Sequence, residues 1–170
     1  MRIVAALFLS MALAASSPVA QNPPQDPIAD AQNHPASKKP AAVKYLFPEQ
    51  ITVPAGKPTP VDLHFQVAEG LHINSHTPHG EEFIATTLAL PETSGVRLAK
   101  ATFPPGTDYA FAIDPTQKLS VYTGDFTIHA ELVSTRGEHL VEATLHYQAC
   151  NNNACMPPHS IPVAIDVIAK

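Results

Sequence analysis

The chain has 170 residues with ten Lys or Arg against fifteen Asp or Glu, which gives a formal net charge of −5. The basic residues are spread along the sequence and form no basic stripe, which argues against nucleic acid and anionic membrane surfaces as partners. A domain of about 125 residues can bury a core on its own, so stability alone does not require a bridge between the only two cysteines.

The N-terminus has the pattern of a secretory signal peptide. Met1 and Arg2 precede an apolar run from Ile3 to Ala15, which suits a signal but is too short to cross a bilayer. We assign residues 1–20 to the signal peptide, and residues 21–43, rich in Pro, Gln, Asn and Ala, to a flexible tether. The mature protein is expected to be exported, without membrane insertion, to a compartment where disulfides form.

Residues 44–170 have the alternating pattern of antiparallel strands. Apolar and polar residues alternate from Val61 to Val67 and from Phe126 to Leu132, as in strands with one buried face. Turn-forming residues separate these runs from further strand candidates, which are residues 45–53, 71–75, 83–90, 96–103, 118–122, 139–149 and 161–168. The pattern predicts an all-β domain with an immunoglobulin-like antiparallel β-sandwich.

Cys150 and Cys155 are the only cysteines and lie five positions apart. A disulfide across so short a loop stabilises a protein by about 2 kcal/mol in the chain-entropy model, less than a bridge across a longer loop. Alternation along the preceding strand puts Cys150 on its polar, accessible face, and residues 151–154 have turn composition. We therefore expect both sulfurs at a hairpin tip, within reach of another protein's thiol.

Three functions are compatible with this pair. In thiol–disulfide exchange, one thiolate attacks a partner and the second cysteine resolves the mixed disulfide. In a non-catalytic binding module, the same bridge would be an inert clip that shapes a loop. In a metallochaperone the thiolates would bind metal with histidines, although His72, His76 and His79 are more simply solvated loop residues. No basic residue lies between His146 and His159, so the local sequence offers no cation to stabilise a thiolate.

The residues around the cysteines resemble a known family. Tyr147-Gln148-Ala149-Cys150 and Cys155-Met156-Pro157-Pro158 are similar to the active-site hairpin of the N-terminal periplasmic domain of the thiol:disulfide interchange reductase DsbD. The similarity extends over about residues 45–167, and its outer matches are Glu69 to Asn74, Phe103 to Gly106 and Ser120 to Gly124.

The resemblance implies an immunoglobulin-like fold, a periplasmic location and protein-disulfide reductase chemistry without a cofactor or metal. It implies a membrane-embedded or thioredoxin-like electron donor, and thioredoxin-like partners such as disulfide isomerases and a thioredoxin of cytochrome c maturation. By position, Cys155 would form the mixed disulfide and Cys150 would resolve it.

The resemblance also implies which residues surround the sulfurs. His72 and Asn74 would lie beside the disulfide, and Tyr147 and Gln148 would flank it. An aromatic cap would shield the sulfurs from within residues 107–117, with Phe111 or else Tyr109 as its lid. Because the sequence ends at Lys170 without the membrane conduit of that reductase, we expect an accessory carrier that relays electrons between other proteins.

Overall fold

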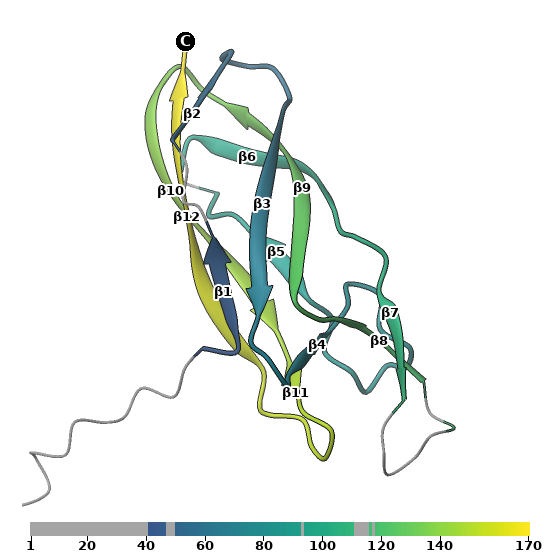
Figure 1. Cartoon of the computed structure of the whole chain (residues 1–170). Helices are drawn as coiled ribbons and strands as arrows, with labels where there is room; N and C mark the ends of the chain where they lie inside the picture. Colours follow the sequence, from purple (N-terminus) through teal and green to yellow (C-terminus); the bar gives the residue numbers. More distant parts are fainter. Residues whose placement is uncertain (1–40, 47–49, 93, 111–115, 117) are drawn as a thin grey trace, which may run out of the picture. The chain divides into compact units, whose positions relative to one another are not determined.

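The computed structural model describes residues 41–46, 50–92, 94–110, 116 and 118–170. The predicted signal peptide and nearly all of the predicted tether lie outside these residues. The described chain forms twelve strands and no helix, arranged in three four-stranded sheets (Figure 1). The prediction of an all-β fold is confirmed.

The first sheet has the order β1 (Val43–Leu46), β3 (Thr59–Val67), β9 (Asp125–Ser134) and β6 (Val96–Thr102), with every pair antiparallel. Along β3, Leu63, Phe65 and Val67 are buried, whereas the residues between them are exposed or half-buried. This alternation fixes the register, because a shift by one residue would turn the apolar side chains to solvent.

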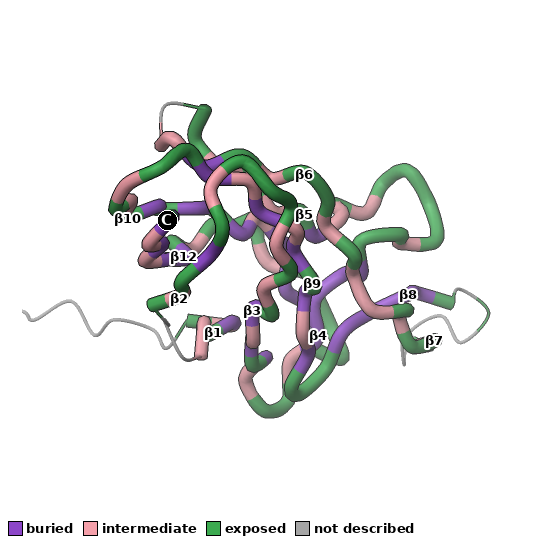
Figure 2. Tube along the Cα trace, turned by 90° about the horizontal axis from the view of Figure 1, so that it is seen from above, coloured by how far each residue is buried: buried purple, intermediate pink, exposed green. Residues whose placement is uncertain are grey.

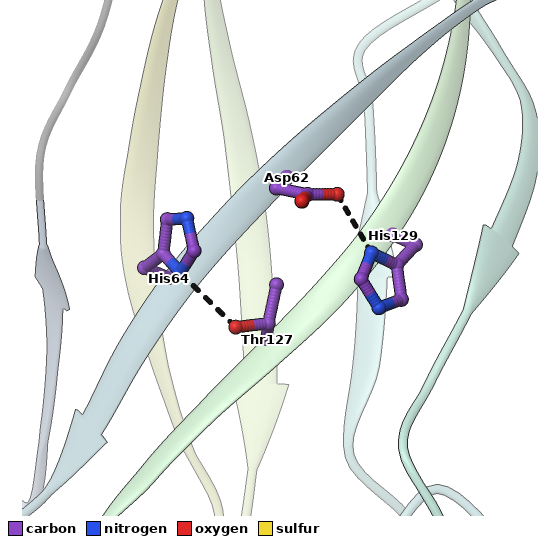
Figure 3. Close-up of polar contacts among 4 residues, drawn as sticks. All are labelled: Asp62, His64, Thr127 and His129. Carbon is purple, nitrogen blue, oxygen red and sulfur yellow. Dashed lines mark hydrogen bonds and ion pairs between the residues drawn. The ribbon is translucent and has the colours of Figure 1, made fainter.

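Polar side chains join β3 to β9 on the outer face of this sheet (Figure 3). His129 Nδ1 lies 2.6 Å from Asp62 Oδ1, and His64 Nδ1 lies 3.0 Å from Thr127 Oγ1. The Asp62 and His129 side chains are more than half exposed, so their pairing adds little to stability.

The second sheet has the order β2 (Gln50–Val53), β12 (His159–Ala169), β10 (Gly137–Tyr147) and β5 (Thr87–Ala89). β10 and β12 pair along their whole length, and β2 joins β12 in parallel. The prediction of one strand over residues 45–53 is wrong, because β1 pairs with β3 and β2 pairs with β12 in another sheet. Of the predicted strand 83–90, only β5 pairs in a sheet.

The third sheet is built from β11 (Ala149–Cys150), β4 (His72–Asn74), β8 (Lys118–Tyr122) and β7 (Thr107–Ala110), in that order. It lies at one end of the other two sheets, at the lower end in Figure 1. Because β8 leads into β9 and β10 leads into β11, this sheet continues strands of both layers past the core. It carries the cysteine hairpin.

The apolar core lies between the first two sheets. Figure 2 shows the buried residues gathered along the inner strands. Phe65, Ile128, Leu145 and Ile165 belong to one cluster and are at most 1% exposed. Tyr122 also packs in this core, where its ring stacks on Phe126 at a centroid distance of 5.0 Å. The fold therefore rests on the packing of two sheets, independently of the disulfide.

Candidate functional site

The two cysteines form a disulfide across a tight turn that follows β11. Within the turn, Asn151 Oδ1 accepts hydrogen bonds from the backbone N–H groups of Asn153 and Ala154, both at 2.9 Å. Beyond it, the Met156 N–H donates to the Ala149 carbonyl at 2.8 Å. The hairpin is therefore closed by hydrogen bonds as well as by the bridge.

The two sulfur-bearing residues differ in exposure. Cys150 is 0% exposed, whereas Cys155 is exposed. The prediction that Cys150 lies on an accessible face is wrong. The chain leaves the second sheet at Gln148 and enters the third, where Cys150 pairs with His72 of β4 and its polar face is no longer open to solvent. Cys155 is therefore open to solvent, whereas Cys150 is enclosed.

An aromatic pair lies beside the bridge. The ring of Tyr109, on β7, packs on the ring of His72 with 4.2 Å between centroids, and the Tyr109 hydroxyl donates a hydrogen bond to Asn152 Oδ1 in the turn between the cysteines. Tyr109 thus links β7 to His72 on β4 and to the turn between the two cysteines. His72 is 2% exposed, and burial lowers the pKa of its imidazole, so the ring is neutral at neutral pH.

Side-chain amides support the hairpin from behind. Asn74 is fully buried, and its Nδ2 donates to Gln148 Oε1 at 3.1 Å. The Gln148 Nε2 in turn donates to the Met156 carbonyl at 3.2 Å. Because Met156 follows Cys155 directly, this chain of hydrogen bonds positions the exposed cysteine relative to β4.

A close backbone contact anchors the start of β7. A Cβ atom on Gly106 would lie 2.0 Å from Ser120 Oγ and 2.8 Å from the Cβ of Ser75, so only glycine fits here. The two serine hydroxyls bond each other at 2.8 Å. This contact sets how closely β7, and with it Tyr109, approaches the hairpin.

The predicted site residues divide into three groups. Cys150, Cys155, His72 and Tyr109 come together, and Asn74 and Gln148 bond each other behind the hairpin. Tyr147 instead packs in the core, is 1% exposed and contacts His159 edge to face; burial raises the pKa of its hydroxyl. The alternative lid, Phe111, lies outside the described residues, and part of the predicted cap loop is the strand β7.

The sequence did not single out Asn152 as a contact of the cap or the Met156 carbonyl as an acceptor. Asn152 stands in a run of three asparagines that indicates only a turn. A backbone carbonyl has no sequence signal at all.

His72 and His76, two of the three histidines considered as metal ligands, have other contacts. His76 Nδ1 lies 2.9 Å from the Thr86 carbonyl oxygen, and its ring stacks on Phe103 at 4.0 Å. Among the described residues, no three His, Cys, Asp or Glu side chains are grouped so as to hold a metal ion. Likewise, no helix long and apolar enough to cross a membrane is found in that part of the chain.

The fold and the hairpin together define an immunoglobulin-like domain that carries a single disulfide at one end, with one cysteine exposed and the other buried. The family model described as "Thiol:disulfide interchange protein DsbD, N-terminal" matches residues 42–165. The chain therefore belongs to this family of thiol–disulfide exchange domains.

Two solved structures are similar to the chain at low sequence identity. The N-terminal domain of DsbD from Neisseria meningitidis, in the reduced form, is 18% identical with a TM-score of 0.44, over 65% of this chain and 79% of that chain. The N-terminal periplasmic domain of ScsB from Proteus mirabilis is 16% identical with a TM-score of 0.49, over 73% of this chain and 44% of that chain. A search of curated proteins gave no match.

Proposed function

We propose that this chain is a periplasmic module that relays reducing equivalents through Cys150 and Cys155. Its electrons would come from a membrane-embedded reductase or a thioredoxin-like donor, and its acceptors would be exported thioredoxin-like proteins. The observation that carries the proposal is the unequal exposure of the two cysteines, because exchange needs one sulfur open to a partner and a second one held close behind it.

The reaction runs through one mixed disulfide. In the reduced module the Cys155 thiolate attacks a partner disulfide, forms a bond to one partner sulfur and releases the other as a thiolate. Cys150 then attacks Cys155 Sγ, the Cys150–Cys155 bond forms, and the second partner sulfur leaves. Two electrons pass to the partner, which takes up two protons, and the module is oxidised.

The exposure of Cys155 supports the proposed roles of the two cysteines. A partner approaching in line with the disulfide reaches Cys155, so Cys155 is the sulfur that forms the adduct. Cys150 is buried and lies opposite His72, bonded to Cys155, and would be the resolving cysteine. Tyr109 would act as the lid, since it contacts both His72 and the turn between the cysteines.

Family membership supports the choice of partners. Disulfide isomerases and a thioredoxin of cytochrome c maturation are the proposed acceptors, and the chemistry is of the protein-disulfide reductase type. The rival is a non-catalytic interaction module in which the bridge only shapes the turn; it predicts no adduct with a thioredoxin-like protein.

A trapping experiment separates the two. Cys150→Ser is expected to form a covalent adduct with an oxidised thioredoxin-like protein, because Cys155 attacks and the resolving thiol is missing. Cys155→Ser is the matched control and should form none, since Cys150 is buried. The exchange role fails if Cys150→Ser forms no adduct, and the assignment of the two cysteines fails if Cys155→Ser forms one.

A further inference from the structure

The resolving step leaves one proton without an obvious acceptor. In the reduced module Cys150 is a thiol, and it attacks only as the thiolate. The residue is shielded from solvent, so bulk water is poorly placed to take the proton. The hairpin itself offers no base, because residues 151–158 contain no His, Lys, Asp or Glu.

Strand pairing brings a base from far away in the sequence. β11 pairs with β4 in antiparallel register, and Cys150 lies directly opposite His72. Side chains of directly opposed residues project from the same face of a sheet, with Cβ atoms about 4.5–5.5 Å apart. The ring of Tyr109 packs on the imidazole, with 4.2 Å between centroids, and helps to hold it in this enclosed position.

From this geometry we propose that His72 is the proton acceptor for Cys150 in the resolving step, an inference that rests on the proposed exchange function. The neutral imidazole takes the thiol proton and becomes an imidazolium. The Cys150 thiolate attacks Cys155 Sγ, the Cys150–Cys155 bond forms and the bond from Cys155 to the partner breaks. The imidazolium then returns its proton to solvent or to the leaving partner thiolate.

The protonation state of His72 suits this role. Burial lowers the pKa of its imidazole, so the base form is available at neutral pH. The titratable neighbours are Cys150 on β11 and Tyr109 on β7, with Lys44 and Glu69 lining the groove that His72 and Tyr109 share. Of these, only Cys150 has to lose a proton for the exchange to proceed.

Ellman's reagent isolates the step. Reduced protein releases one thionitrobenzoate when Cys155 attacks the reagent and a second one when Cys150 resolves the adduct. Thionitrobenzoate leaves as an anion and needs no proton, so the pH dependence of the second release reports the deprotonation of Cys150.

Two replacements of His72 guard against a simple packing effect. His72→Phe keeps an aromatic ring against Tyr109, and His72→Gln keeps hydrogen-bonding capacity, but neither has a base that titrates near neutral pH. The matched control is His139→Gln, near the opposite end of β10 and about 26 Å of strand away from Tyr147. The control is expected to behave as wild type.

Both His72 variants are expected to slow the second release on the order of 10-fold at about pH 7. The difference should narrow as the pH rises, because hydroxide at higher concentration can take the thiol proton in place of His72. A wild-type profile in both variants would overturn the proposal. Uniform slowing at every pH would also overturn it, because that outcome indicates a purely structural role.

A second measurement does not depend on exchange. In Cys155→Ser, thiolate absorbance reports the ionisation of Cys150 alone. Transfer of its proton to His72 gives a thiolate–imidazolium pair, so adding His72→Gln should lower the thiolate fraction at about pH 7 on the order of 10-fold. An unchanged titration refutes the role of His72. If this titration shifts as expected but wild-type protein never resolves the adduct, the exchange function fails and the contact between His72 and Cys150 stands.

Discussion

If Tyr109 is the lid proposed above, removing its contacts should make the disulfide more reactive. The hydroxyl donates one hydrogen bond, to Asn152 Oδ1, and the ring packs on His72. A hydrogen bond at an exposed position contributes about 0.5–1 kcal/mol, and the ring pair adds about 0.5–1.5 kcal/mol. Tyr109→Phe should therefore open the cap about 2–5-fold more often, and Tyr109→Ala on the order of 10-fold more often.

The assay is the rate of reduction of the Cys150–Cys155 bridge by a thiol reductant in excess. Asn152→Ala should accelerate the reaction as much as Tyr109→Phe does, and the two changes combined should add nothing, since they remove the same hydrogen bond. Asn153→Ala, in the same turn, is the control and should react at the wild-type rate. An unchanged rate in Tyr109→Ala would refute the shielding role of this side chain.

Three further changes test the supports of the site. Gln148→Ala should lower the free energy of unfolding by about 1–3 kcal/mol, because Asn74 and the Met156 carbonyl each lose a half-buried hydrogen-bond partner. Gln50→Ala, on the surface, should cost less than about 0.5 kcal/mol, and equal losses in urea titrations would contradict this. Gly106→Ala should cost about 1–3 kcal/mol and expose the bridge to reductant, with partial recovery on adding Ser120→Ala; a wild-type stability would refute the close contact. Because burial lowers the pKa of His72, the unfolded chain binds more protons below about pH 6.5, so stability should fall as the pH drops from there toward the folded-state pKa. In His72→Phe, stability should not fall over this pH range. If it still falls, another titrating group causes the loss of stability.

The fold could be predicted because its signal is local. Alternation along residues 61–67 and 126–132 fixes which side chains face the core, and β3 and β9 form over those residues. The division of residues 45–53 into β1 and β2 could not be predicted in the same way. Which sheet each half joins depends on pairing with β3 or β12, and those partners are distant in the sequence.

The sequence indicated the cysteine hairpin but not the burial of its residues. The motif around Cys150 and Cys155 indicated the chemistry, yet strand parity alone placed Cys150 on an open face. The chain changes sheet at Gln148, where β11 pairs with β4. Cys150 therefore lies opposite His72 and is buried instead of exposed. A base absent from the local sequence is thus supplied by a strand almost eighty residues earlier.

The reduction potential of the Cys150–Cys155 bridge tests the exchange function most directly. Full-length protein equilibrated with a thioredoxin of known potential gives the value from the fraction reduced. A relay of electrons to thioredoxin-like proteins predicts a potential above about −300 mV, so that the bridge exchanges electrons reversibly with the thioredoxin. A value clearly below about −300 mV, with the bridge resistant to reduced thioredoxin, would contradict the relay and identify the disulfide as a structural clip.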